Sequence, residues 1–258
     1  LTSPIAINDT TGNITIVGLG ASSLTISGGG TTGLFNVYTP TTMTNLTLTA
    51  ANGAGLIGGG ALYSNSTLRL DNVIINNATA AQGGAIYQDG GSANFNFITL
   101  GNGLYTVNTG NVTLGGITTN STVSVNGNTT NSCISVTGAI NATGGSGGVS
   151  ITGRNVAVTA NILSAAGDIA IYGNGGGVYQ TGTFDGVRIS GSGANVSTTG
   201  GNITLEGRGG SGSISPGVNL TNSTVAATNS GCITIAGISG NGSTNNATGV
   251  FANSACVT

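Results

Sequence analysis

Apolar residues and small polar residues alternate in short triplets along the whole chain. Alternation with a period of two places the apolar residues on one face of a strand and the polar residue on the other. The pattern therefore predicts many short, half-buried β-strands. Examples are Ile14-Thr15-Ile16, Leu24-Thr25-Ile26, Leu46-Thr47-Leu48, Val112-Thr113-Leu114, Ile134-Ser135-Val136, Ile169-Ala170-Ile171, Ile203-Thr204-Leu205 and Ile233-Thr234-Ile235.

The triplets recur at a near-constant step in the second half of the chain. The first apolar residues of successive triplets fall at positions 169, 187, 203, 218 and 233. One short strand per step is the sequence signature of a solenoid. With about 16–20 residues per coil and strands about 4.8 Å apart, we expect about 13–15 coils in a rod about 65–70 Å long.

The composition supports an all-β fold. Of the 258 residues, 49 are Gly, and only 4% are charged, with no His and no Trp. The glycines follow no Gly-X-Y period, which excludes collagen. Helix surfaces usually carry charged and long side chains, so this chain must build its surface from Thr, Ser, Asn and Gly on strands and turns.

The few charges exclude several classes of function. The four arginines form no cluster, and the formal net charge is −2, so we expect no nucleic-acid binding through phosphate neutralisation. No apolar run approaches the roughly 18 residues of a membrane span, so we expect a chain that does not span the membrane. The chain begins at Leu1 without a signal peptide, which favours a processed or excised part of a longer polypeptide.

A glycine-rich phrase occurs twice in the first half. Gly59-Gly60-Ala61-Leu62-Tyr63 returns as Gly83-Gly84-Ala85-Ile86-Tyr87, and the strand 68–77 lies between the two copies. This combination resembles the right-handed parallel β-helix of bacterial autotransporter passengers and chlamydial polymorphic outer-membrane proteins. The resemblance implies a fold, because the matching residues are structural.

The second half has a different repeat. Units that begin near Ser132, Gly167, Gly201 and Gly231 each run into a Gly-Val pair, at 148–149, 186–187, 217–218 and 249–250. These units resemble the filamentous-haemagglutinin repeats of two-partner-secreted adhesins. We therefore expect one right-handed parallel β-helix (β-solenoid) over residues 1–258. Its predicted parts are coils of the Gly-Gly-Ala-Ile-Tyr type in 1–105, a transition in 106–130 and haemagglutinin-type repeats in 131–258.

The resemblance implies an extracellular, cell-surface protein without catalytic activity. The expected role is the stalk of an adhesin or a subunit of a self-assembling surface filament. Expected partners are glycans or proteins on host or neighbouring cells. The unpaired strand edges at the two ends of a solenoid also predict end-to-end self-association. We expect no cofactor.

A polysaccharide-binding or polysaccharide-cleaving β-helix is the alternative. Glycosidic hydrolysis needs two carboxyl groups about 5–10 Å apart, and Asp168 and Asp185 are separated by about one expected coil. Both residues stand in ordinary turn dipeptides, and the chain offers no His or Lys as a further acid or base. We therefore assign no catalytic residues. We also assign no metal ligands, because the glycine-rich calcium nonapeptide is absent.

Threonine occupies the outward position of many triplets and suggests a minor alternative. Ice-binding solenoids present flat arrays of Thr, normally in two columns. The companion column here is mixed, and Thr is in any case a good exposed strand residue. The residues expected in one solvent-facing column are Thr15, Thr25, Thr47, Thr113, Thr204 and Thr234.

Four Asn residues beside these triplets begin Asn-x-Thr acceptor sequences: Asn13, Asn45, Asn111 and Asn202. Such sequences accept N-linked sugars in secreted proteins. Attached sugars would help a nearly uncharged rod to remain soluble. We therefore predict these four residues as glycosylation candidates.

The three cysteines leave at least one thiol without an intramolecular partner. Cys133 and Cys232 lie about six expected coils apart, well beyond the about 7 Å that a disulfide allows between Cα atoms. Cys232 and Cys256 lie about one expected coil apart and are the candidate disulfide. Cys133 is then a free or intermolecular thiol. Small residues buried in turns are the alternative interpretation of all three.

Overall fold

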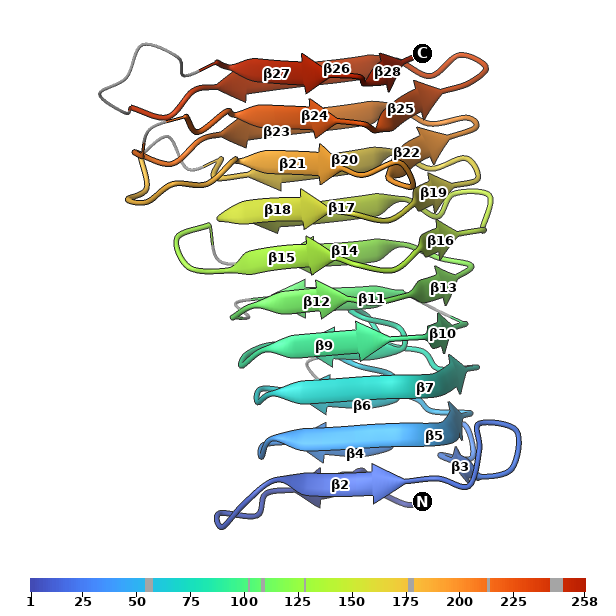
Figure 1. Cartoon of the computed structure of the whole chain (residues 1–258). Helices are drawn as coiled ribbons and strands as arrows, with labels where there is room; N and C mark the ends of the chain where they lie inside the picture. Colours follow the sequence, from blue (N-terminus) through green and yellow to red (C-terminus); the bar gives the residue numbers. More distant parts are fainter. Residues whose placement is uncertain are drawn as a thin grey trace.

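The chain forms a stack of β-strand coils (Figure 1). The computed structural model describes residues 1–53, 58–101, 103–107, 110–127, 129–175, 179–212, 214–241 and 248–258. Every assigned element in these residues is a strand, and all pairings are parallel. The predicted all-β parallel β-helix is therefore confirmed, while the right-handed sense of winding stays a prediction.

The strands form a ten-stranded sheet, here sheet A, and an eighteen-stranded sheet that bends into two faces, B1 and B2. Sheet A contains β1 (Ile5–Ile7), β4 (Phe35–Val37), β6 (Leu62–Ser64), β8 (Ile86–Gln88), β11 (Leu104–Val107), β14 (Val123–Asn126), β17 (Val149–Gly153), β20 (Ile169–Gly173), β23 (Ile203–Arg208) and β26 (Ile233–Ile238).

Face B1 contains β2 (Ile14–Val17), β5 (Thr41–Thr49), β7 (Leu68–Asn76), β9 (Ala93–Asn96), β12 (Val112–Leu114), β15 (Cys133–Val136), β18 (Asn155–Val158), β21 (Val187–Ser190), β24 (Val218–Thr221) and β27 (Val250–Asn253). Face B2 contains the second halves of β5 and β7 together with β3 (Thr25–Ser27), β10 (Ile98–Leu100), β13 (Ile117–Thr119), β16 (Ile140–Ala142), β19 (Ile162–Ser164), β22 (Asn195–Thr198), β25 (Thr224–Ala227) and β28 (Cys256–Val257).

Each coil passes once through sheet A, face B1 and face B2, so the described residues make ten coils and the predicted 13–15 coils are wrong. The triplets at 169, 203 and 233 are neighbours in sheet A, whereas those at 187 and 218 are neighbours in face B1. The step between successive triplets in the sequence is therefore about half a coil. With strands about 4.8 Å apart, ten coils measure about 43 Å along the axis.

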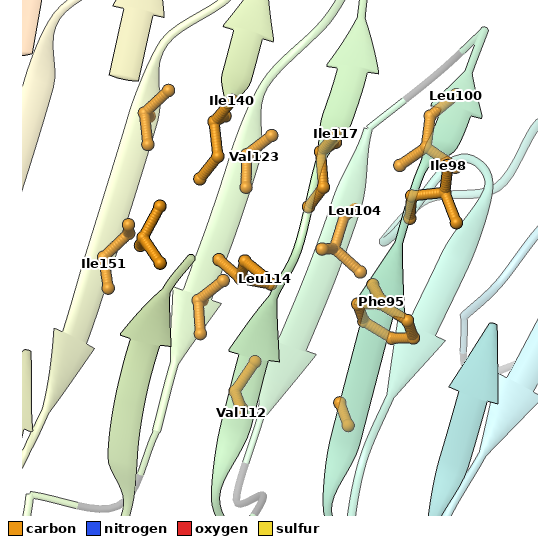
Figure 2. Packing of buried hydrophobic residues seen from close by; sticks show 14 of the residues in the cluster. Phe95, Ile98, Leu100, Leu104, Val112, Leu114, Ile117, Val123, Ile140 and Ile151 are labelled. Carbon is orange, nitrogen blue, oxygen red and sulfur yellow. The ribbon is translucent and has the colours of Figure 1, made fainter. Parts of the chain in front are cut away.

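The core is built from ladders of inward-facing apolar side chains. One ladder in sheet A connects Ile5 to Ile233 through ten coils, with Phe35, Leu62, Ile86, Leu104, Val123, Val149, Ile169 and Ile203 in register. Figure 2 shows the same kind of packing around Phe95, Leu114 and Ile151, which are almost completely buried. Burial of this apolar surface, at about 25 cal/mol per Å², supplies most of the stability.

The bend between faces B1 and B2 depends on residues with positive φ. Asn45 in β5 has φ 57° and Asn72 in β7 has φ 53°. Asn tolerates this left-handed conformation better than most residues. The Asn72 Nδ2 atom donates a hydrogen bond to Asn45 Oδ1 (2.8 Å), so the two bends also bond to each other.

The two copies of the glycine-rich phrase stack directly on each other. Leu62 pairs with Ile86, and Tyr63 pairs with Tyr87. The glycines that begin the two copies, Gly59 and Gly83, have φ values of 77° and 53°. Gly supports this conformation without steric cost, which explains why both copies begin with it.

Three of the four Gly-Val pairs of the second half, at 186–187, 217–218 and 249–250, mark narrow necks, whereas Val149 of the fourth pair begins β17 in sheet A. A Cβ atom added to Gly173, Gly207 or Gly237, at the ends of sheet A strands, would overlap the carbonyl oxygen of Gly186, Gly217 or Gly249, respectively. Each of these partners directly precedes a strand of face B1. The glycine pairs therefore let sheet A and face B1 approach closely at the base of each long loop.

The segment predicted as a transition, 106–130, continues the stack. Its strands β12 and β13 pair with strands of the coils on both sides. β14 pairs with β11 and β17 in sheet A. The polar composition of this segment therefore changes the outer surface and leaves the pairing of the coils intact.

Candidate functional site

The two candidate catalytic carboxylates lie on different faces. Asp168 directly precedes β20 of sheet A, and Asp185 precedes β21 of face B1. Asp168 Oδ1 accepts a hydrogen bond from the backbone N–H of Asn202 (2.7 Å). Asp185 Oδ2 accepts one from the Asn219 side chain (2.8 Å). The expected stacking of the two residues is wrong, because the stretch of chain between them makes only about half a coil.

Asp185 is nevertheless the unusual carboxylate of the pair. Partial burial raises the pKa of Asp185 above its ordinary value. The hydrogen bond from Asn219 and the nearby Arg188 guanidinium oppose this rise, because both favour the charged form. These contacts hold the turn before β21 and bring no second carboxylate to the site.

The threonines do not form one column. Thr15 and Thr113 lie on face B1, Thr25 and Thr47 on face B2, and Thr204 and Thr234 on sheet A. Thr47 is also buried, and its hydroxyl donates to the carbonyl of Ala21. The single solvent-facing Thr column, on which the ice-binding alternative depends, is therefore wrong.

Three of the four candidate glycosylation residues accept hydrogen bonds within the rod. Asn45 Oδ1 accepts from Asn72, as described above. Asn111 Oδ1 accepts from the backbone N–H of Cys133 (3.0 Å), and Asn202 Oδ1 accepts from that of Cys232 (2.9 Å). Asn13 is exposed before β2. Bonds between coils thus explain part of the Asn-x-Thr pattern, and glycosylation stays a prediction.

All three cysteines are free thiols, so the expected Cys232–Cys256 disulfide is absent. Cys232 directly precedes β26 in sheet A, whereas Cys256 begins β28 on face B2. The segment that joins these two cysteines is shorter than one coil, because a full coil in this part of the chain runs from Ile203 to its partner Ile233. Cys133 is partly buried, while the other two thiols are exposed.

A groove of about 330 Å³ runs along the outer surface where the strands of face B1 begin. Its floor includes outward residues of consecutive strands, namely Thr42, Arg69, Asn94 and Thr113, which are direct register partners. One wall of the groove is formed by residues that stand shortly before these strands or before β2, namely Asn13, Pro40, Thr67, Ser92 and Asn111. We call this feature the corner groove. It crosses five coils.

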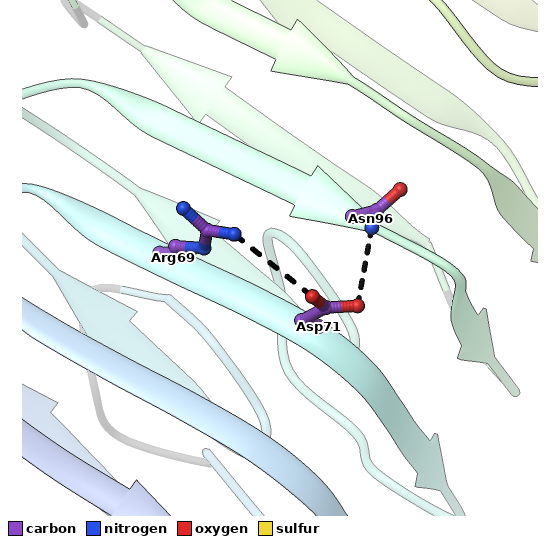
Figure 3. Close-up of polar contacts among 3 residues, drawn as sticks. All are labelled: Arg69, Asp71 and Asn96. Atoms are coloured by element: carbon purple, nitrogen blue, oxygen red, sulfur yellow. Dashed lines mark hydrogen bonds and ion pairs between the residues drawn. The ribbon is translucent and has the colours of Figure 1, made fainter.

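Arg69 is the charged residue of the corner groove. Its Nη2 atom lies 4.0 Å from Asp71 Oδ2, and its side chain is 55% exposed. Asp71 Oδ1 also accepts a hydrogen bond from Asn96 Nδ2 (3.1 Å), so this carboxylate bridges two neighbouring strands (Figure 3). Asp71 therefore orients the guanidinium of Arg69 and leaves most of its N–H donors available to solvent.

Two of the remaining arginines hold loops in place. The guanidinium of Arg154 lies 4.4 Å from the ring centre of Phe184. The guanidinium of Arg208 lies 5.0 Å from the ring centre of Tyr179. Arg154 Nη2 also donates to the carbonyl of Thr181 (2.7 Å). These cation–π contacts give both arginines a structural role at the loops around 179–186 and 209–212.

Tyrosines on sheet A also pack on each other. The rings of Tyr63 and Tyr87 are stacked with their centres 6.0 Å apart. The ring centre of Tyr38 lies 6.1 Å from that of Tyr63. Burial and the charge of Asp89 raise the pKa of Tyr63, whose hydroxyl donates to Asp89 Oδ2 (3.3 Å). Tyr87 is almost completely buried, so the stack contributes mainly to packing.

Sequence reasoning did not select Arg69 and Asn94 as site residues. A usable signal is the correspondence of 68–72 with 93–97, whose offset is close to that between the two copies of the glycine-rich phrase. This correspondence places Arg69 and Asn94 at the same position of consecutive coils, as the register confirms.

Among the described residues, no group of three or more His, Cys, Asp or Glu side chains is placed to hold a metal ion. The same part of the chain contains no helix that is long and apolar enough to cross a membrane. No family model matches the chain, and neither the curated proteins nor the solved structures include a match. The structure is therefore the evidence for the fold, and the surface residues are the evidence for the function.

Proposed function

We propose that this chain is the rod of an extracellular adhesin at the cell surface. The observation that supports the proposal most is the core ladder that continues through all ten coils, from Ile5 to Ile233. Such a rod is stiff and almost free of charge, with an exterior of Thr, Ser, Asn and Gly. These properties suit a spacer that holds binding surfaces away from a cell, and they add to the resemblance of its repeats to adhesin β-helices.

The proposal predicts that the chain is accessible on intact cells of its native source. Brief treatment of those cells with a protease of broad specificity should release peptides of this chain, identifiable by mass spectrometry. An abundant cytoplasmic protein serves as the control for lysis. Recovery of the chain only after lysis would contradict a surface location.

A filament subunit is the second candidate, and it requires that the last coil of these 258 residues stays uncovered in the full protein. Among the described residues, the strands of this coil lack a neighbour on one side, and Val250, Phe251 and Val257 are all more than 40% exposed. Apolar side chains beside an unpaired strand edge promote pairing with another copy. A contact from the last coil of one copy to the first coil of the next would be heterologous and would produce an open fibre.

A polysaccharide-cleaving enzyme has less support, because Asp168 and Asp185 lie on different faces. The direct test incubates the purified chain with polysaccharides and measures new reducing ends. We expect none; an activity that disappears in Asp185→Asn would instead favour the enzyme.

A further inference from the structure

We propose that the corner groove binds a linear polysaccharide that carries carboxylate groups. This inference deepens the proposed surface role, on which it rests, by giving the rod a ligand class and a site. The groove lies on the outer surface and crosses five coils, from Asn13 to Asn111 and Thr113. A long, straight and regularly spaced site suits an extended polymer better than a compact small molecule.

The spacing of the groove matches a repeating ligand. Thr42, Arg69, Asn94 and Thr113 stand on consecutive strands and in register. Their backbones therefore repeat at the strand spacing of about 4.8 Å. A sugar residue in an extended polysaccharide is about as long as this spacing, so each coil can offer one polar side chain to about one sugar residue.

The chemistry of these side chains suits sugar hydroxyls and carboxylates. The amide of Asn94 and the hydroxyls of Thr42 and Thr113 are only partly buried, and within the described part of the chain none of them has a hydrogen-bond partner. Amide and hydroxyl groups both donate and accept, as sugar hydroxyls do. These groups are free to exchange bonds with water for bonds with a ligand.

Charge decides in favour of an acidic polymer. Arg69 is the charged residue among those that line the groove, and no carboxylate belongs to that set. A guanidinium binds a carboxylate through two parallel N–H···O bonds, which makes this contact strong and directional. Asp71 Oδ2 lies 4.0 Å from Arg69 Nη2, so the Asp71 carboxylate competes with a ligand carboxylate for Arg69 and lowers the affinity of the site.

Arg188 provides a matched control. It stands at the same outward position of face B1, in register with Ala157 and Asn219, and is exposed like Arg69. It does not line the groove. Arg188→Gln therefore removes the same charge from the same face and leaves the proposed site intact.

The test measures binding of the purified chain to hyaluronan and alginate, with neutral dextran as the comparison, by calorimetry at low and moderate salt. We expect binding to the two acidic polymers that weakens with salt, and little binding to dextran. Arg69→Gln should weaken binding about tenfold or more, since hydrogen bonds to charged groups contribute most. Asp71→Asn should strengthen it, and Arg188→Gln should leave it unchanged.

Several outcomes would overturn the inference. Equal weakening by Arg69→Gln and Arg188→Gln would show a general charge effect, and equal affinity for dextran would show that carboxylates do not matter. Absence of binding to all three polymers by a correctly folded chain would remove the site altogether. Thermal unfolding of each variant checks the fold. Because surface exposure is measured separately on cells, the rod proposal and the groove proposal can fail independently.

Discussion

At the scale of single residues, glycine and the few carboxylates in this chain have local tasks that composition alone does not reveal. The glycines at the necks are needed because two backbones meet there, whereas Gly193 faces open space. Asp168 and Asp185 accept hydrogen bonds that join neighbouring coils. A residue type that is common along the chain is therefore essential at some positions and replaceable at others.

Replacement of Gly207 by Ala should destabilise the rod. The added Cβ atom would overlap the carbonyl oxygen of Gly217, so the neck must widen, at a cost of about 1–3 kcal/mol. The free energy of unfolding, measured in urea, checks this effect. Gly193→Ala is the control, because a Cβ atom there meets nothing within 4 Å, and it should be neutral or slightly stabilising.

Replacement of Asp185 by Asn should change how stability depends on pH. Partial burial raises the pKa of Asp185 in the folded chain, so the folded state binds its proton more tightly than the unfolded state does. This group therefore adds stability below its unfolded pKa of about 3.8 and loses that contribution as pH rises through the raised folded value.

Denaturation curves from acidic to neutral pH provide the measurement. As pH rises across that range, the free energy of unfolding of the original chain should fall relative to that of the Asp185→Asn variant. The Asn side chain in this variant still offers an acceptor to Asn219. The same pH dependence in both chains would show that Asp185 does not contribute.

At the scale of elements, the bends in β5 and β7 join faces B1 and B2 into one continuous sheet. Each bend has an Asn with positive φ, and the two side chains bond to each other. The next strand pair bends at Phe97, with φ 50°, where the strand is interrupted between β9 and β10. The bend is thus a repeated backbone feature that Asn supports best.

Two substitutions of Asn72 should separate backbone conformation from hydrogen bonding. Asn72→Gly keeps easy access to positive φ and loses the bond to Asn45, so we expect a loss of about 1 kcal/mol. Asn72→Ala loses both, and we expect a loss larger by about 1 kcal/mol. Equal losses in the two variants, measured by urea unfolding, would contradict a role for the φ angle.

At the scale of the whole molecule, the two ends of the stack differ from its sides. The sides are mostly polar, with a few exposed apolar side chains, and their strands are paired, whereas the last coil combines an unpaired edge with exposed apolar side chains. Phe251 in the last coil is 41% exposed, and Phe97 on the side of the rod is 69% exposed. Phe251 stands in the outward column of face B1, in register with Asn219, but it belongs to the last coil, so the two residues allow the last coil and a coil inside the stack to be compared.

We expect the purified chain to self-associate through its ends. The mass measured by light scattering should rise with concentration, and electron microscopy should show short linear fibres. Phe251→Lys should reduce association, because Lys at a strand edge disfavours pairing with another copy. Phe97→Lys removes a more exposed Phe from the side of the rod and should have little effect. The reverse ranking of the two variants would show lateral association.

The sequence by itself determined the local structure. Period-two alternation identified strands such as 14–16 and 203–205 and the side of each that faces the core. The paired phrases at 59–63 and 83–87 stand one coil apart, as their register in sheet A shows, although no stacking was predicted from their spacing. The near absence of charge favours a function that depends on surface and shape, and this function stays a prediction.

Only the tertiary structure decided which of the three faces each strand occupies. Alternation reports the inward side of a strand and carries no information about its neighbours, and loops of unequal length hide the coil period. The coil from Ile169 to Ile203 is nearly twice as long as the coil from Ile86 to Leu104 in the same rod. For this reason the coil count, the Asp168–Asp185 pair, the Thr column and the Cys232–Cys256 pair were wrong. The corner groove became visible only when Arg69 and Asn94 were placed on neighbouring coils.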